Sequence, residues 1–251
     1  MTPDLAAAIT TIAEADRLLV ALDFDGTLSE LVSVPSDARP VPGVLDGLRR
    51  LGDTVDTDLV LISGRARHDL AEVSGAGDLA VLIGSHGQEQ GQTVALDRAE
   101  SDLLDRLRGR VDAAVADLPC ARVEAKPAGF AIHVRGCPAV DAQAVEAAIR
   151  AVADELPEVH TIAGKSVVEV SVRPLDKGSA VRALIEAEPD RRVLFAGDDV
   201  TDETALGALR AGDLGIKVGT GDTVAAFRVE HPSAMVEVLG ALIAARQSRV
   251  S

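Results

Sequence analysis

The sequence is poor in aromatic and in basic residues. Its 251 residues include no Trp, no Tyr and only four Phe, which argues against aromatic platforms on which bases or sugar rings stack. Lys and Arg number 25 against 40 Asp and Glu, giving a formal charge of −15. Such a chain lacks the basic surface that binds nucleic acid or anionic membranes non-specifically. An anionic ligand would need local positive charge or a metal ion.

Long apolar runs are absent as well. No stretch of the sequence reaches the roughly 18 uninterrupted apolar residues that a membrane-spanning helix needs. The first fifteen residues lack the basic segment and apolar core of a secretory signal. We therefore expect a cytoplasmic protein with no membrane partner and no nucleic-acid partner, and we expect it to be a monomer.

Only two cysteines occur, Cys120 and Cys137. Neither belongs to a Cys-x-x-Cys motif or a Cys/His cluster. A disulfide would form only if the fold brought the two side chains together. We predict reduced thiols, as is usual in a reducing compartment.

Short apolar runs are plentiful, and hydrophobic residues make up 47% of the chain, enough to bury a core. Five runs predict buried strands, and amphipathic stretches between several of them predict helices. Alternating strands and helices favour an α/β fold with a parallel sheet covered on both faces. The predicted strands span residues 17–24, 58–62, 79–83, 192–196 and 214–218.

The middle of the chain follows a different pattern. A helical stretch at 99–118 precedes two strand-like runs joined by a turn signal at 126–129. A second helical stretch, at 139–156, precedes another candidate hairpin about Gly164-Lys165. This order is typical of an α+β module. We predict an inserted domain at 93–173 within a core formed by residues 1–92 and 174–251.

Two carboxylates, Asp23 and Asp25, stand one residue apart at the end of the first predicted strand. The pair can supply a nucleophile that attacks phosphorus and an acid/base that serves the leaving oxygen. For an isolated Asp-x-Asp, a turn without chemistry is the more common explanation. Ser63, Gly84 and Asp198 also follow predicted strands, at the sheet edge where α/β proteins bind ligands.

Three acidic residues, Asp198, Asp199 and Asp202, close another predicted strand. Their alternative explanation is a solvated turn at a helix start. With Asp23 and Asp25 they would gather up to five carboxyl groups at one edge, which is costly unless a divalent cation neutralises them. Oxygen ligands of this kind suit Mg²⁺, so we predict a Mg²⁺ site.

Ser63 and Lys177 complete the pattern. Ser63 precedes a helical stretch, where its hydroxyl and nearby N–H groups could hold phosphate oxygens, although a plain helix cap would explain it too. Lys177 could offset the charge of carboxylate and phosphate, or lie exposed at a helix start. Neither residue is specific alone.

Taken in order, these motifs resemble the four signatures of the haloacid-dehalogenase (HAD) superfamily. The resemblance implies a HAD-like Rossmannoid core and an inserted cap of the C2 type. It implies that Asp23 is the nucleophile and a Mg²⁺ ligand, and that Asp25 is the acid/base with its carbonyl on the metal. Ser63 and Lys177 would bind the phosphoryl group. Asp198 would ligate Mg²⁺, supported by Asp199 and Asp202.

Within that superfamily the chain is similar to the trehalose-6-phosphate phosphatases. This similarity implies Mg²⁺-dependent hydrolysis of a small-molecule sugar phosphate, trehalose 6-phosphate, in trehalose biosynthesis, through an aspartyl-phosphate. It rests on residues 61–65, 84–87, 123–126, 133–135, 164–170 and 197–203. The implied substrate contacts are Gly64, Arg65, His86 and Gly87 in the core and Glu124, Lys126, Arg135, Lys165 and Glu169 in the cap.

Other interpretations fit the same residues. A phosphatase of this fold could act on sucrose phosphate, mannosyl phosphoglycerate or a trehalose-like pseudo-disaccharide phosphate. A mutase would isomerise the sugar phosphate. A regulatory module would keep the fold without catalysis, but such a module would tolerate loss of the acidic residues, so their presence argues against it. Polar cap residues could form a solvated strand face. We also expect the cap to close over the core about hinges near 88–97 and 173–176.

Overall fold

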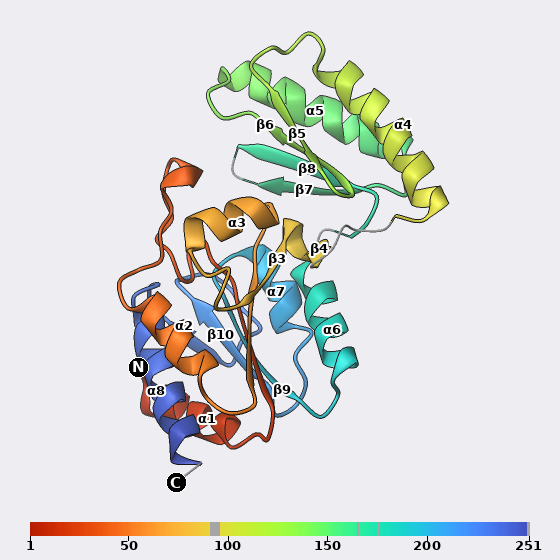
Figure 1. The fold of residues 1–251 in the computed structure, drawn as a ribbon. Coiled ribbons are helices and arrows are strands. Elements are labelled where there is room, and N and C mark those ends of the chain that lie inside the picture. The colour runs from red at the N-terminus through yellow and green to blue at the C-terminus, as the bar shows by residue number, and fades with distance from the viewer. Residues whose placement is uncertain (91–95, 165, 175, 250–251) are drawn as a thin grey trace. The chain divides into compact units, whose positions relative to one another are not determined.

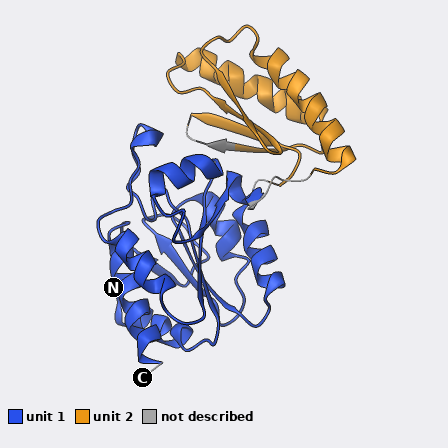
Figure 2. Cartoon of the chain, in the orientation of Figure 1, with its two compact units in different colours: residues 1–91, 176–251 blue, residues 92–175 orange. Residues whose placement is uncertain are grey.

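The computed structural model describes residues 1–90, 96–164, 166–174 and 176–249. The chain forms two compact units (Figure 2). Unit 1 combines residues 1–91 with 176–251, and unit 2 comprises residues 92–175. Unit 2 is therefore an insertion between two halves of unit 1. The predicted hinge segments fall partly outside the described residues, at 91–95 and 175.

Unit 1 is built on a seven-stranded sheet with the order β11-β10-β9-β1-β2-β3-β4 (Figure 1). All neighbouring strands are parallel except β3 and β4. This confirms the predicted parallel α/β sheet. The strands are β1 (Leu18–Leu22), β2 (Thr57–Ile62), β3 (Val81–Gly84), β4 (Glu89–Gln90), β9 (Arg192–Gly197), β10 (Leu214–Val218) and β11 (Phe227–Val229).

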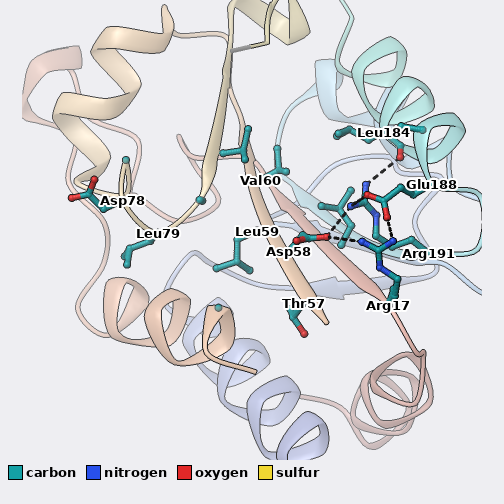
Figure 3. A pocket seen from close by; sticks show the side chains of 16 residues that line it. Arg17, Thr57, Asp58, Leu59, Val60, Asp78, Leu79, Leu184, Glu188 and Arg191 are labelled. Atoms are coloured by element: carbon teal, nitrogen blue, oxygen red, sulfur yellow. Dashed lines mark hydrogen bonds and ion pairs between the residues drawn. The ribbon is translucent and has the colours of Figure 1, made fainter. Parts of the chain in front are cut away.

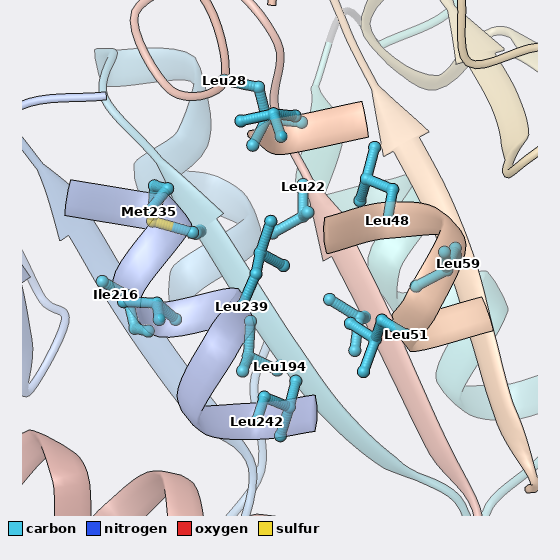
Figure 4. Packing of buried hydrophobic residues seen from close by; sticks show 14 of the residues in the cluster. Leu22, Leu28, Leu48, Leu51, Leu59, Leu194, Ile216, Met235, Leu239 and Leu242 are labelled. Carbon is cyan, nitrogen blue, oxygen red and sulfur yellow. The ribbon is translucent and has the colours of Figure 1, made fainter. Parts of the chain in front are cut away.

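Both faces of this sheet are buried, and successive side chains of a strand point to opposite faces. In β1, Leu18, Val20 and Leu22 enter one hydrophobic cluster, whereas Leu19 and Ala21 enter another. Figure 4 shows the first cluster, where leucines of α2 and α8 lie against the strands. That face is covered by α1 (Pro3–Ala13), α2 (Val44–Gly52), α3 (Arg67–Ser74) and α8 (Ala234–Ser248), and the other by α6 (Lys177–Ala187) and α7 (Val200–Leu206).

Unit 2 has its own sheet, with the order β5-β6-β8-β7 and antiparallel pairing throughout. Its apolar face packs on two helices to form a separate core. The helix, hairpin, helix, hairpin order confirms the predicted α+β module. Its elements are α4 (Arg98–Val115), β5 (Arg122–Lys126), β6 (Gly129–His133), α5 (Ala139–Glu155), β7 (His160–Gly164) and β8 (Val167–Ser171).

No helix among the described residues is long and apolar enough to span a bilayer.

The two cysteines form a disulfide in unit 2, so the prediction of reduced thiols is wrong. Cys120 precedes β5 and Cys137 follows β6, with their Cα atoms 5.3 Å apart. The antiparallel register pairs Arg122 with His133 and so brings the two ends of this hairpin together. The separation of 17 residues between the two cysteines does not predict a disulfide. The register of the predicted hairpin would have predicted it, because it places the two cysteines beside each other.

Candidate active site

The predicted core residues meet at the carboxyl edge of the unit 1 sheet. Strand β1 lies between β9 and β2, so Asp23, Ser63 and Asp198, which follow these strands, become neighbours despite their distance in sequence. Gly84 ends β3, the next strand of the sheet. The convergence predicted from the strand ends is therefore present.

A buried lysine links two of the carboxylates. The Lys177 ammonium donates to Asp23 Oδ1 at 2.5 Å and to Asp202 Oδ1 at 2.7 Å. Lys177 is 2% exposed, Asp23 3% and Asp202 0%. Lys177 is the first residue of α6, whose N-cap is Asp176. The alternative of an exposed helix-start lysine is therefore wrong.

Three carboxylates gather around this lysine. Asp23, Asp198 and Asp202 each offer an oxygen within 4.8 Å of the others. Asp23 Oδ2 is buried and accepts no hydrogen bond from any described residue. A buried carboxylate oxygen without a hydrogen bond, in a residue that clusters with two other carboxylates, fits a divalent cation, because Mg²⁺ and similar ions bind carboxylate oxygens.

The pKa values of the clustered carboxylates also indicate that positive charge would stabilise their ionised forms. Burial raises the pKa of Asp23 well above its usual range, and the charges of Asp202 and Asp198 add to this rise while Lys177 opposes it. Burial, with Asp202, raises the pKa of Asp198 to about 6. Burial disfavours charged Lys177, but Asp202 and Asp23 outweigh it and raise the lysine pKa. A cation at this point would favour the ionised carboxylates.

The side chain of Asp199, which the sequence assigns to the metal site, caps a helix. It is the N-cap of α7 and accepts from the Val200 N–H at 2.8 Å. Asp202 completes a capping box by accepting from the Asp199 N–H at 2.9 Å. Asp202 thus binds both the helix start and Lys177. Of the five predicted ligand residues, the structure clusters the side chains of Asp23, Asp198 and Asp202.

Gly26 permits the close approach of two site segments. Its φ is +81°, in the left-handed region that favours glycine. A Cβ at this position would lie 2.1 Å from Asp198 Oδ2. Glycine at position 26 therefore makes room for the Asp198 carboxylate. A turn without chemistry would not explain this close packing.

Ser63 lies in a loop that is tied to the end of β3. Its Oγ accepts from the Arg65 N–H at 3.1 Å, and the His86 N–H donates to its carbonyl at 3.0 Å. Ser63 is 1% exposed. Helix α3 begins only at Arg67, with Ala66 as N-cap. Ser63 is therefore not a helix cap.

The predicted substrate residue Arg65 binds Asp25. Its Nε and Nη2 donate to the two carboxylate oxygens of Asp25, each at 2.6 Å. Its guanidinium also lies over the Phe24 ring, 5.9 Å from the centroid. Sequence reasoning placed Arg65 in the site but missed its pairing with Asp25, because no local sequence pattern predicts contact between two residues that are forty positions apart.

The other predicted core contacts pack tightly around this loop. The His86 ring lies against Gly64, where a Cβ would come 2.6 Å from its Cε1. Gly87, with φ +106°, packs on α6, and a Cβ there would lie 2.9 Å from that of Ala180. Gly64, Arg65, His86 and Gly87 thus belong to two adjoining loops after β2 and β3.

In unit 2, two predicted sugar-binding residues contact each other. Glu124 accepts from Lys126 Nζ at 2.8 Å and lies 2.7 Å from His133 Nε2. The hydrogen bond to His133, assisted by Lys126, lowers the pKa of Glu124 to about 2. Sequence reasoning did not assign a role to His133. The register of the predicted hairpin would have placed it on this face.

The remaining predicted cap residues divide between the sheet and its turns. Ala131 pairs with both Glu124 and Glu169, so the two glutamates share one sheet face across a small residue. Arg135 lies in the turn after β6. Lys165 is outside the described residues.

A separate pocket of about 610 Å³ lies at the opposite, amino-terminal ends of β1 and β2 (Figure 3). None of the predicted site residues that the structure describes lines it. One wall is an ion-pair network in which Arg191 donates to Asp58 and Glu188, each at 2.9 Å. This network ties the end of α6 to the start of β2, so the pocket wall has a structural explanation.

A parallel sheet with this buried Asp and Lys cluster, interrupted by an antiparallel unit, defines a phosphatase fold of the HAD superfamily. Comparison with known proteins gives the family. A model of the trehalose-phosphatase family matches residues 21–234, and the chain belongs to this family. That places it among the phosphoric monoester hydrolases.

Related proteins cover both units. The chain is 32% identical over 214 residues to a trehalose-6-phosphate phosphatase of Escherichia coli, covering 82% of this chain and 79% of that protein. It is 31% identical over 252 residues to a trehalose-phosphate phosphatase of Mycobacterium marinum, covering 90% of this chain but only 61% of that protein. A solved trehalose-6-phosphate phosphatase related protein superposes with a TM-score of 0.72 at 27% identity, over 92% of this chain and 99% of the other.

Proposed function

We propose that this protein hydrolyses trehalose 6-phosphate to trehalose and phosphate. Its family and the named activities of its relatives support the substrate. The observation that carries the chemistry is the buried cluster in which Lys177 binds Asp23 beside Asp198 and Asp202. It combines a nucleophile, a fixed positive charge and a place for a cation within one edge of the sheet.

The reaction proceeds in two steps on the residues of unit 1. A carboxylate oxygen of Asp23 attacks phosphorus while the bond from phosphorus to the sugar oxygen breaks, and Asp25 gives that oxygen its proton. Water then attacks the phosphorus of the aspartyl-phosphate and yields a proton to Asp25. The Asp23 carboxylate leaves, and inorganic phosphate is released.

The surrounding groups bind and neutralise the phosphoryl group. Lys177 and Ser63 would hold its oxygens, with the positive charge of Lys177 aimed at the charge that develops during transfer. Mg²⁺ would be held by Asp23, Asp198 and Asp202 with the Asp25 carbonyl and support from Asp199. When bound, it supplies Lewis-acid charge stabilisation at the phosphoryl oxygens.

Unit 2 would select the sugar. We propose that Glu124, Lys126 and Glu169, with Arg135 and Lys165, bind sugar hydroxyls, since carboxylates accept from hydroxyls and lysines donate to them. His133 would position Glu124 through their 2.7 Å contact. Polar groups left unpaired against a different sugar would disfavour it.

The test is phosphate release from trehalose 6-phosphate with Mg²⁺ or with EDTA, and Asp23→Asn serves as the blank. We expect turnover that requires both Mg²⁺ and Asp23. Activity that survives Asp23→Asn would overturn the mechanism. Activity on sucrose phosphate or mannosyl phosphoglycerate alone would overturn the substrate, and isomerised sugar phosphate without free phosphate would indicate a mutase.

The role of unit 2 is tested by Glu124→Gln. We expect kcat/KM for trehalose 6-phosphate to fall by about tenfold or more, the effect of losing one charged hydrogen bond to a hydroxyl. Hydrolysis of p-nitrophenyl phosphate, which has no sugar, should be unchanged. Equal losses on both substrates would show that Glu124 does not read the sugar.

We also propose that the protein is a cytoplasmic monomer. Sedimentation at the 26.0 kDa mass of one chain would support the oligomeric state, and cell fractionation would test the location.

A further inference from the structure

The ion pair between Arg65 and Asp25 conflicts with the chemistry proposed for Asp25. Both oxygens of the Asp25 carboxylate are engaged by the guanidinium, each at 2.6 Å. A general acid must instead carry a proton and reach the leaving oxygen. In the geometry described here both oxygens of Asp25 are held by Arg65, so the carboxyl group must leave the guanidinium before it can reach a leaving oxygen.

We propose that Arg65 is a latch that holds Asp25 until the phosphoryl group of the substrate replaces the carboxylate on the guanidinium. This inference rests on the proposed function and adds a positioning role for Arg65. Phosphate binding would thereby release the acid at the moment when it is needed.

The charges around the site favour this exchange. The fork of an arginine binds a carboxylate or a phosphate in the same two-pronged way. The ammonium of Lys177, 3% exposed, is already shared between Asp23 and Asp202. Arg65 and Asp25 are more accessible, with side chains 13% and 29% exposed. A phosphate dianion can therefore reach the guanidinium and compete with the single charge of Asp25.

We infer that side-chain rotation is enough for the exchange, because backbone hydrogen bonds hold the loops on both sides. The Ser85 N–H donates to the Arg65 carbonyl at 2.7 Å. Gly84 presses against the same loop, where a Cβ would lie 2.8 Å from that carbonyl. On the Asp25 side, the Gly26 N–H donates to the Ser29 carbonyl at 2.8 Å. Both loops can thus stay in place while Asp25 swings away from Arg65.

The experiment is a double-mutant cycle on the binding of inorganic phosphate, measured by calorimetry in the presence of Mg²⁺ with the full chain. Asp25→Ala removes the competitor, so it should tighten phosphate binding by about tenfold if the unlatched state is populated at about 10%. Arg65→Gln should weaken binding. In the Arg65→Gln background, Asp25→Ala should change affinity by less than about twofold.

Two controls keep the result interpretable. Arg67→Gln alters a neighbouring arginine, the first residue of α3, whose Nε donates to the Leu82 carbonyl, and it should leave phosphate affinity unchanged. Arg65→Lys keeps the charge but not the fork, so Asp25→Ala should tighten binding less in that background. Thermal melting of each variant confirms that it is folded.

The latch is overturned if Asp25→Ala does not tighten phosphate binding, or if it does so equally without Arg65, which would be a general charge effect. The cycle measures binding without turnover, so its outcome is separate from the proposed function. Failure of the wild type to hydrolyse trehalose 6-phosphate would reject that function and leave the binding result standing.

Discussion

At the scale of residues, Lys177 connects the fold to the chemistry. It begins α6 and binds carboxylates that follow β1 and lie in α7. With all groups ionised, three carboxylates and one ammonium leave two negative charges on the cluster. A single divalent cation would balance these two charges. Lys177 therefore has a second role, because its positive charge determines that a divalent ion neutralises the cluster.

Gly26 offers a sharp test of this packing. In Gly26→Ala the new Cβ would overlap the Asp198 carboxylate and hold a φ of +81° that alanine disfavours. We expect destabilisation of about 1–3 kcal/mol and loss of phosphatase activity, measured by thermal melting and phosphate release. As the control, Gly240→Ala in α8 meets no atom within 4 Å and should stabilise by about 0.5–1 kcal/mol. A fully active Gly26→Ala would contradict the proposed geometry.

The raised pKa of Asp198 predicts how metal binding depends on pH. Its folded pKa of about 6 exceeds the roughly 3.9 of an unfolded aspartate. The folded state therefore binds the proton more readily, and the stability this adds to the metal-free protein is full below about pH 4 and lost as the pH rises through about 6.

A cation needs the ionised carboxylate, so protons and Mg²⁺ compete at this site. We expect Mg²⁺ to raise Tm more at about pH 7.5 than at about pH 5, as measured by scanning calorimetry against EDTA. Asp198→Asn should remove most of this difference. An equal Mg²⁺ effect at both pH values would place the ion elsewhere.

At the scale of elements, the disulfide closes the hairpin of β5 and β6. Reduction, or the double variant Cys120→Ser and Cys137→Ser, should lower the free energy of unfolding by about 3 kcal/mol, because the bond restricts the unfolded chain. Circular dichroism in urea suits this measurement, since the chain has no Trp or Tyr. Reductant should have no effect on the double variant. Two free thiols in the unreduced, denatured protein would show that the bond is absent.

Elements with strong local patterns could be predicted from the sequence. Residues 214–218 form β10 with the predicted bounds. A short, mostly apolar run between turn residues is typical of a strand that is buried on both faces of a parallel sheet. The order of elements in unit 2 was predictable for a different reason, because turn signals separate its helical stretches from its strand-like runs.

Side-chain partners were harder to predict than strands. An Asp at a strand end can point to a metal site or cap the following helix, and only the backbone path separates Asp198 from Asp199. The pairing of Arg65 with Asp25 depends on two adjacent loops. Long-range geometry of this kind is set by packing, which no local pattern records.

At the scale of the whole molecule, the two units have separate cores. Every residue of the unit 2 hydrophobic cluster lies between 92 and 175, and the clusters of unit 1 contain none of them. We expect residues 92–175 alone to fold cooperatively, as domains of this size can, with one sharp transition in circular dichroism. A broad, non-cooperative melt in the oxidised peptide would contradict this.

The position of β1 between β2 and β9 shapes how the protein is made. On the ribosome, β2 emerges soon after β1, but β9 follows only when all of unit 2 has been synthesised. The β1 edge that pairs Leu18 with Arg192 therefore stays open in the nascent chain, and open strand edges invite aggregation. We expect the closing of this long-range pair to be the slow step of folding. The acidic site, which needs residues from both sides of the insertion, would then be the last part of the newborn protein to form.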